Sequence, residues 1–155
     1  MAKVETPYDD LTYKIIGLAM AVHSELGPGF PEEVYRRAMM VAMGADGMPY
    51  ESEFKIQVAF GGQAVGEFRL DFVVDRKAVV EFKAVDALES AYERQVISYL
   101  TASGLEIGLL INFGSARLEY KRIFPPKAVQ VSAAFQSRRL NLTPSVQSVS
   151  SVDEK

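Results

Sequence analysis

The chain has 155 residues, of which 48% are hydrophobic and 24% are charged, so it can bury an adequate core as a single domain. It contains no cysteine, which excludes disulfides and thiolate metal sites, and a single histidine, which excludes a multi-histidine zinc centre. No apolar run reaches the length of about 18 residues that spans a membrane, and the N-terminus lacks a basic-then-apolar signal. We therefore expect a cytoplasmic protein with no membrane partner.

The formal net charge of −3 and the pI near 5.3 are unfavourable for a protein that grips long DNA by neutralising its phosphates. Basic residues do occur in local pairs, and these form either a groove or ordinary solvated faces. The pairs are Arg36 with Arg37, Arg69 with Lys83, Lys121 with Arg122, and Arg138 with Arg139. We expect the isolated chain to bind nucleic acid weakly.

The first predicted helix runs from about Asp9 to Glu25, since apolar residues recur at helical spacing over this range. Either Asp9 or Asp10 suits its N-terminal cap. The next segment, residues 27–30 (GPGF), places a proline between two glycines and so ends the helix.

A second helix is predicted directly after this break. Pro31 suits its first position, and Glu32 and Glu33 then fall in its first turn, where the helix dipole favours acidic side chains. Plain helix capping explains Glu33, whereas a further role for Glu32 stays open on these grounds.

Three consecutive strands follow. The first covers about residues 54–60, where apolar residues alternate with polar or small ones before a Gly-Gly turn. The other two are residues 69–74 (RLDFVV) and 78–83 (AVVEFK), which are rich in β-branched and aromatic residues and are separated by the turn-like residues 75–77 (DRK). These two strands should form a hairpin.

A three-residue turn fixes which side chains of this hairpin face each other. Directly opposed residues share one face of a sheet, and side chains alternate along a strand. The predicted pairs are Val74 with Ala78, Phe72 with Val80, Leu70 with Phe82, and Asp71 with Glu81. Lys83 then shares a face with Glu81, and a turn shorter by one residue would send Glu81 to the opposite face.

This register places the carboxylates of Asp71 and Glu81 roughly 5 Å apart at the end of an otherwise apolar hairpin. The two groups repel each other and resist desolvation unless a cation or a proton neutralises them. Mg²⁺ or Mn²⁺ suits this role because hard cations prefer oxygen ligands, and Lys83 can orient a water or stabilise negative charge on a phosphate. The alternative is a solvated strand-end ion pair, but both faces of each strand carry apolar residues, as interior strands do. The pattern indicates divalent-metal phosphodiester chemistry.

A third helix is predicted to start near Asp86 and Glu89, which suit a capping box, and to end at Gly104. Gln95 and Tyr99 are four residues apart and share one face of it. Residues 107–111 then form a continuous apolar run typical of a buried strand, and residues 118–124 alternate like an edge strand.

Residues 29–35 (GFPEEVY) match the motif G-x-x-E-x-x-Y. Together with RLDFVV, VVEFKAV, the Gln95–Tyr99 pair and GLLINFG, they resemble the GxxExxY proteins of the PD-(D/E)XK nuclease superfamily over roughly residues 23–123. The resemblance implies an α/β fold with a PD-(D/E)XK nuclease-like αβββαβ core, whose mixed central sheet is flanked by helices. It also implies a Mg²⁺ or Mn²⁺ ion held by Glu32, Asp71 and Glu81, with Lys83 as the catalytic lysine.

The resemblance further implies substrate or metal-shell contacts by Gln95 and Tyr99, which match the Q-x-x-x-Y element of some exonuclease relatives. His23 occupies the position of a histidine that is common before the G-P-G turn, and Tyr92 stands where many members have histidine. Plainer interpretations exist: His23 satisfies a local hydrogen bond, and Tyr35 and Tyr99 are packing residues whose hydroxyls touch the rim of the site. Gln95 is better placed, since an amide can hydrogen-bond a phosphate.

The segment after residue 124 is unlike such a core, because two prolines end the last strand and scattered apolar residues follow. These are Val129, Val131, Phe135, Leu140 and Leu142. We divide the chain into a nuclease-like domain, residues 1–124, and a C-terminal extension, residues 125–155. We expect the extension to pack on a neighbouring subunit and to make the protein a homo-oligomer.

These patterns favour a Mg²⁺-dependent nuclease of the GxxExxY type that acts on DNA or RNA. The alternative is a non-catalytic protein that keeps the fold and either assembles into oligomers or binds nucleic acid. The intact set of Glu32, Asp71, Glu81 and Lys83 favours the enzyme, whereas the acidic balance and the apolar extension favour the alternative.

Overall fold

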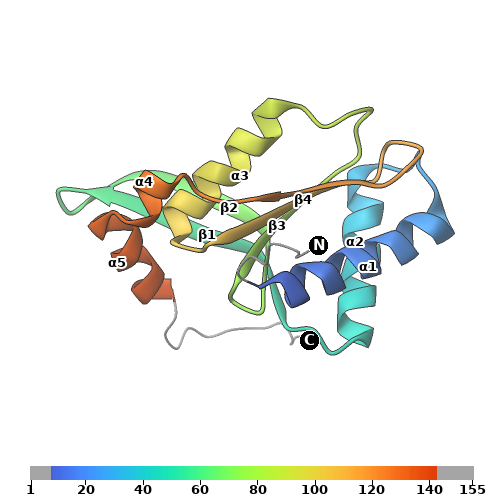
Figure 1. The fold of residues 1–155 in the computed structure, drawn as a ribbon, viewed down its shortest axis with the longest axis horizontal. Helices are drawn as coiled ribbons and strands as arrows, with labels where there is room; N and C mark the ends of the chain where they lie inside the picture. Colours follow the sequence, from blue (N-terminus) through green and yellow to red (C-terminus); the bar gives the residue numbers. More distant parts are fainter. Residues whose placement is uncertain (1–7, 143–155) are drawn as a thin grey trace, which may run out of the picture.

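The computed structural model describes residues 8–142, which form two helices, three strands, a helix and two strands in the predicted order, followed by two short helices (Figure 1). The elements are α1 (Asp9–Leu26), α2 (Glu32–Ala45), β1 (Tyr50–Phe60), β2 (Gln63–Val74), β3 (Ala78–Lys83), α3 (Ser90–Ser103), β4 (Ile107–Asn112), β5 (Glu119–Ile123), α4 (Lys127–Gln130) and α5 (Ala133–Leu142). Within this described part, no helix is long and apolar enough to cross a bilayer.

The five strands form one mixed sheet in the order β1-β2-β3-β4-β5, which is also their order along the chain. Every neighbouring pair is antiparallel except β3 and β4, which run parallel. Parallel neighbours need a crossover connection, and α3 provides it. The predicted α/β fold with a mixed sheet flanked by helices is confirmed.

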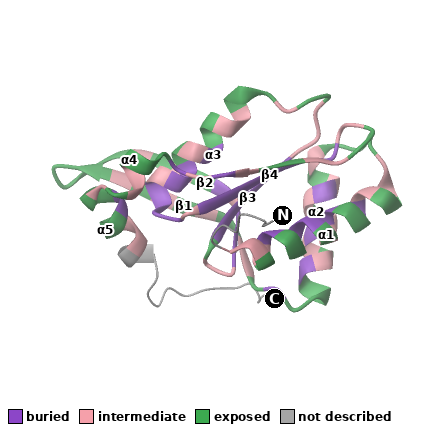
Figure 2. Cartoon of the chain, in the orientation of Figure 1, coloured by how far each residue is buried: buried purple, intermediate pink, exposed green. Residues whose placement is uncertain are grey.

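Helices cover both faces of the sheet. On one face, α1 and α2 pack against Phe72, Val80 and Leu109, and on the other face α3 packs against Val79 and Leu110. All of β4 and most of β3 are therefore buried, whereas the far end of the β1–β2 hairpin is exposed (Figure 2). The site described below lies where the buried part of β2 and β3 meets the helices.

Strands β1 and β2 change faces at Glu53 and Asp71. The ladder skips these two residues, which lie between the pairs Ser52–Phe72 and Phe54–Leu70, and Glu53 has a positive φ of 51°. Phe72 contributes to the core under α1 and α2, while Leu70, two residues earlier, contributes to the core under α3. Since residues two apart on a regular strand share a face, the strand turns over at this point.

This turn-over explains where the predicted hairpin register holds and where it fails. The pairs Phe72–Val80, Val73–Val79 and Val74–Ala78 form as predicted, and the ladder ends there. The predicted pairing of Leu70 with Phe82 is wrong, because the two side chains belong to cores on opposite faces of the sheet.

The helix starts differ from the predictions in three places. Tyr8 occupies the cap of α1 with a left-handed φ of 63°, so Asp9 and Asp10 lie in the first turn. Pro31 is the cap of α2 rather than its first residue, and Glu89 caps α3 without the side-chain hydrogen bond of a capping box. Acidic residues near a helix start are stabilised by the dipole in the first turn as well as at the cap, so composition alone did not separate these positions.

The C-terminal extension folds back on its own domain as far as the structure describes it. Phe135 of α5 is fully buried, and Arg138 Nη1 donates a hydrogen bond to the Thr101 carbonyl at 3.1 Å. Arg139 Nη1 lies 2.9 Å from Glu106 Oε2. The expectation that this segment would be exposed without a second subunit is therefore wrong for Phe135. The side chains of Leu140 and Leu142 and all of residues 143–155 lie outside the described part.

Candidate functional site

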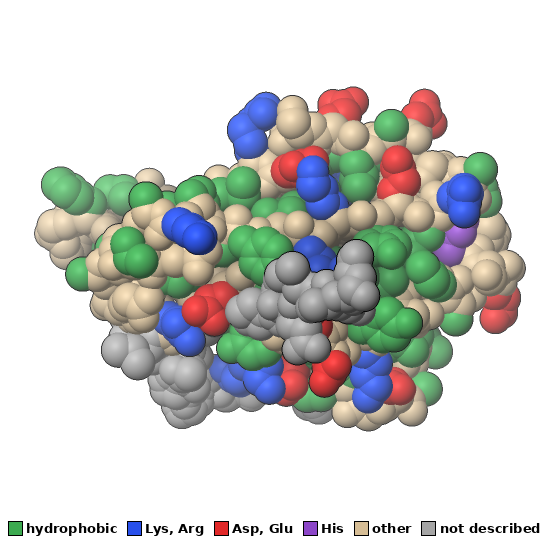
Figure 3. Space-filling view, viewed as in Figure 1, with side chains coloured by type: hydrophobic (Ala, Val, Ile, Leu, Met, Phe, Trp, Pro, Cys, Tyr) green, Lys and Arg blue, Asp and Glu red, His purple; other side chains and the backbone are tan. Residues whose placement is uncertain are grey.

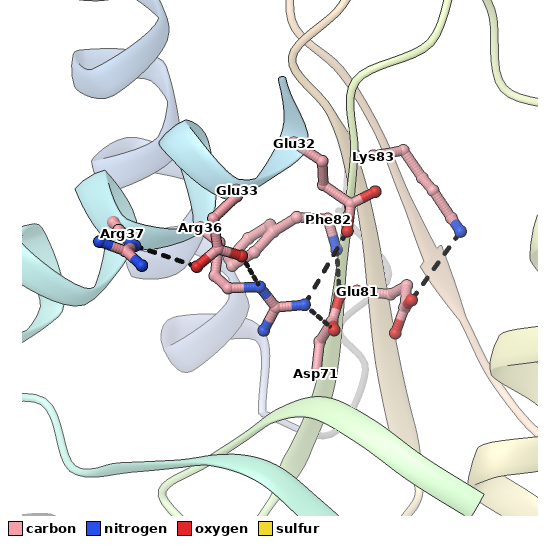
Figure 4. A network of polar contacts seen from close by, with 8 residues as sticks. All are labelled: Glu32, Glu33, Arg36, Arg37, Asp71, Glu81, Phe82 and Lys83. Atoms are coloured by element: carbon pink, nitrogen blue, oxygen red, sulfur yellow. Dashed lines mark hydrogen bonds and ion pairs between the residues drawn. The ribbon is translucent and has the colours of Figure 1, made fainter. Parts of the chain in front are cut away.

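Asp71 lies at the point where β2 and β3 stop pairing. Because the ladder ends at Phe72–Val80, the next backbone N–H of β3 on this side, that of Phe82, has no carbonyl partner on β2 and instead donates to Asp71 Oδ2 at 3.4 Å. The Asp71 side chain thus fills the gap that opens between the diverging strands. Figure 4 shows its carboxylate beside β3, close to the carboxylates of Glu32 and Glu81.

Glu81 is the most strongly perturbed acid of the site. Its side chain is 8% exposed, its Oε1 is buried without a hydrogen-bond partner in the protein, and its Oε2 lies 3.9 Å from Lys83 Nζ. Burial, and then the negative charge of Asp71, raise the pKa of Glu81 from 4.5 to about 8, while Lys83 acts in the opposite direction. A protonated Glu81 can also donate a hydrogen bond to Asp71, which favours the protonated form. The metal-free carboxyl is therefore mainly neutral near pH 7.

Glu32 reaches the same cluster from the first turn of α2, with its side chain 41% exposed. Partial burial, and then the charge of Asp71, raise its pKa, and Lys83 and Arg36 partly offset this increase. The electrostatic influence of Asp71 and Lys83 shows that the helix brings Glu32 to the end of the hairpin, where the motif comparison had placed it.

Lys83 ends β3 on the same side as Glu81. Besides its contact with Glu81, its Nζ lies 4.7 Å from the centre of the Tyr92 ring on α3, within cation–π range. Tyr92 therefore does more than occupy a peripheral position where a histidine is common. It helps to hold the ammonium group over the site.

Arg36 is the residue of this site that the sequence analysis did not identify. Its guanidinium Nη2 hydrogen-bonds Asp71 Oδ1, its Nε lies 3.2 Å from Glu33 Oε1, and its Nη2 lies 3.9 Å from Glu32 Oε2 (Figure 4). Its Cζ sits 5.4 Å from the centre of the Phe72 ring. The sequence does hold one signal, since Arg36 follows Glu32 by four residues and so shares a helix face with it.

The carboxylates do not stand ready in the geometry of a three-ligand metal site. Among residues 8–142, no three His, Asp or Glu side chains lie close enough together to hold one ion. In their place, Arg36 neutralises Asp71, and a proton neutralises Glu81 near pH 7. The roles of Glu32, Asp71 and Glu81 as metal ligands therefore stay a prediction.

The donor set nevertheless fits a hard divalent cation. Three carboxylates are the oxygen ligands that Mg²⁺ and Mn²⁺ prefer, and the buried Oε1 of Glu81 lacks any partner in the protein. A buried, unpartnered carboxylate oxygen is costly unless a cation or a proton satisfies it. A cation between these groups would meet this need.

Two of the predicted substrate-contact residues lie on α3. Tyr99 is 8% exposed, its ring packs edge-on against Phe68 at 5.7 Å, and burial together with the charges of Glu81 and Asp71 raises its pKa to about 12. Its hydroxyl is thus a neutral group within electrostatic reach of the carboxylates. Gln95 is exposed on the same helix, one turn earlier.

Tyr35 and His23 are engaged away from the carboxylates. Tyr35 is fully buried, and its hydroxyl donates to the Gly27 carbonyl and accepts from the Phe30 amide at 3.2 Å, which fixes the loop between α1 and α2. His23 Nε2 lies 3.0 Å from the Ser115 carbonyl in the loop between β4 and β5. The structure thus gives both residues the plainer, structural roles in holding loops.

Sheet order, crossover helix and an acidic cluster with a lysine at the diverging end of a hairpin together define an α/β domain with the layout of a metal-dependent phosphodiesterase. The family comparison agrees: the chain belongs to the PD-(D/E)XK nuclease superfamily, whose family model matches residues 9–123.

Solved structures show the same fold at low sequence identity. The crystal structure of SSO0001 is 18% identical, with 88% of this chain and 68% of that chain covered and a TM-score of 0.51. An alkaline exonuclease from Laribacter hongkongensis is 10% identical, with 89% and 82% covered and a TM-score of 0.47. A comparison with curated proteins gave no match.

Proposed function

We propose that this protein is a divalent-metal-dependent nuclease of the GxxExxY type, which hydrolyses phosphodiester bonds of DNA or RNA. Membership of the PD-(D/E)XK nuclease superfamily supports the reaction class. The observation that carries the proposal is the buried Glu81 carboxyl, which has an unpartnered oxygen beside Asp71 and below Lys83. A structural role gives no reason to bury such a group at the end of an apolar hairpin.

Asp71, Glu81 and Glu32 would hold the cation. When bound, Mg²⁺ or Mn²⁺ supplies positive charge that polarises a phosphoryl oxygen. Lys83 then holds a second positive charge beside Glu81, and its contact with the Tyr92 ring restrains the ammonium group. In this role Lys83 orients the attacking water or stabilises the negative charge that develops on the phosphate.

Gln95 is the favoured contact for the rest of the substrate, since an exposed amide on α3 can donate to a phosphate. The Tyr99 hydroxyl stays protonated at any ordinary pH because its pKa is raised to about 12. It therefore acts as a neutral hydrogen-bond donor at the inner wall of the site and not as a general base.

The proposal predicts that the wild type cleaves DNA or RNA with Mg²⁺ or Mn²⁺ and that Glu81→Gln and Asp71→Asn do not. Lys83→Met should lose about 10²-fold or more in rate while it still binds the metal, since removal of one transition-state donor typically costs that much. Cleavage is measured on labelled single strands, duplexes and RNA with variants purified identically. Metal binding is followed by the melting temperature, which Mg²⁺ or Mn²⁺ should raise in the wild type and not in Asp71→Ala.

The alternative, a non-catalytic nucleic-acid-binding or assembly protein, has one observation in its favour, the net charge of −3. It predicts a metal response without cleavage of any substrate. Cleavage that persists unchanged in Glu81→Gln would trace the activity to a contaminant and remove the support for the enzyme.

A further inference from the structure

Arg36 places a permanent positive charge inside the carboxylate cluster. Its side chain is 15% exposed, and its closest acidic partner is Asp71, whose side chain is 14% exposed. Both are thus largely removed from water, where a charge pair is screened little. The same arginine also faces Glu33 and Glu32 from its own helix.

We propose that Arg36 is a built-in competitor of the divalent cation for Asp71. Its guanidinium neutralises this carboxylate in the metal-free protein and leaves it when a cation binds there. The inference rests on the proposed metal site and adds a residue that sets the metal affinity of that site.

The contacts of Asp71 make exchange, rather than sharing, the expected outcome. Oδ1 accepts from Arg36 and Oδ2 accepts from the Phe82 amide, so both oxygens already have a donor. A divalent cation on Asp71 would meet the guanidinium at close range in a poorly solvated site, where like charges repel strongly. The cation and the guanidinium therefore compete for one carboxylate.

Arg36 also has a position to which it can move. Its Nε already lies 3.2 Å from Glu33 Oε1, and the Glu33 side chain is 57% exposed on the outer side of α2. In its present position Arg36 leaves Nη1 buried without an acceptor, a cost that retreat toward Glu33 and solvent would relieve. Glu33, which the sequence explains as a helix-start acid, thereby acquires a second role as the alternative partner of Arg36.

The neighbouring Arg37 offers a matched control. It stands on the same turn of α2, carries the same charge and contacts Glu33 through its Nε at 3.0 Å, but its side chain is 77% exposed. Arg36→Met and Arg37→Met thus remove the same charge from nearly the same place, and only the first removes the contact with Asp71.

The test is a calorimetric titration of both variants and the wild type with Mn²⁺. Arg36→Met should bind Mn²⁺ about tenfold more tightly than the wild type, a difference of about 1.4 kcal/mol, and Arg37→Met should stay within about twofold. In EDTA, Arg36→Met should melt at a lower temperature than the wild type, and Mn²⁺ should raise its melting temperature by more. Arg36→Gln, which keeps one donor for Asp71 without the charge, provides a second variant if Arg36→Met folds poorly, and it should also bind more tightly.

Equal affinities in the wild type and both Arg36 variants would overturn the competition while leaving the metal site intact. Weaker binding in the Arg36 variants would also overturn it, because Arg36 would then support the metal ligands. If the folded wild type and all variants bind no Mn²⁺, the proposed metal site itself fails and the inference falls with it.

Discussion

At the scale of single residues, the site is governed by how Glu81 is neutralised. A carboxyl buried beside another carboxylate can hold a proton or face a cation, and it cannot stay charged alone without a large cost. Asp71 meets the same requirement differently, because Arg36 reaches it from α2. Two acids in contact thus use a proton and a guanidinium, and a divalent cation would replace both.

The raised pKa of Glu81 predicts that metal-free stability falls as pH increases. Between pH 4.5, the ordinary pKa, and about 8, the pKa in the folded protein, the folded chain binds more protons than the unfolded chain. The free energy of unfolding should therefore be highest below this range and decrease across it, by up to about 1.4 kcal/mol per pH unit. Urea denaturation in EDTA at several pH values measures the slope.

Glu81→Gln should flatten this dependence, whereas Glu67→Gln on the exposed part of β2 should leave it unchanged. A wild-type stability that increases with pH over this range would contradict the burial argument.

Strand alternation and the three-residue turn were sufficient to predict that Asp71, Glu81 and Lys83 lie together, because both are local properties of the chain. Arg36 could not be predicted in the same way. Its partner Asp71 is 35 residues away, and its role depends on how α2 docks against the sheet. In the sequence it was only one member of a basic pair, as expected of a solvated helix face.

At the scale of elements, the C-terminal extension depends on one close backbone contact. A Cβ atom built on Gly104, at the end of α3, would lie 2.3 Å from the backbone nitrogen of Arg139 in α5. Gly104 is also left-handed, with φ of 77°. The glycine was predicted as a helix stop, but its second function of admitting α5 requires the tertiary structure.

This contact predicts that Gly104→Ala destabilises the protein more than Gly62→Ala. The two glycines have nearly the same φ, 77° and 79°, but Gly62 has nothing within 4 Å of a built Cβ. Gly62→Ala should cost about 1 kcal/mol from backbone strain alone, and Gly104→Ala should cost roughly 2 kcal/mol more, the usual range for overpacking. Chemical denaturation measures both, and equal costs would mean that α5 does not pack closely on α3 in solution.

At the scale of the whole molecule, the basic pairs do not combine into one binding stripe. On the face shown in Figure 3, basic and acidic side chains are interspersed. Several of the arginines and lysines are also held by partners in the chain: Arg36 by Asp71, Lys121 by Glu93, Arg122 by Thr12, and Arg139 by Glu106. Weak binding of nucleic acid in the absence of a metal ion is the expected result.

The homo-oligomer stays a prediction, with a narrower basis than the sequence suggested. Phe135 is buried within the chain, whereas Val131 is 80% exposed and available for contact. Truncation after Pro126 should lower the melting temperature by several degrees even in a monomer, because it uncovers the part of α3 under α5. Light scattering of both chains separates the cases. An oligomer that dissociates on truncation supports the prediction, and a monomeric wild type removes it.

The turn-over at Glu53 also bears on aggregation. Strand β1 is an edge of the sheet, and an exposed edge is a template on which a strand of another molecule can add. Here the edge is interrupted twice, by the unpaired, left-handed Glu53 and by a register shift between Val58 and Ala59. Such irregularities twist an edge away from a flat partner. The distortion that sets Asp71 into the gap between strands therefore also guards the molecule against growth into fibres, and any assembly of this chain should use a surface other than β1.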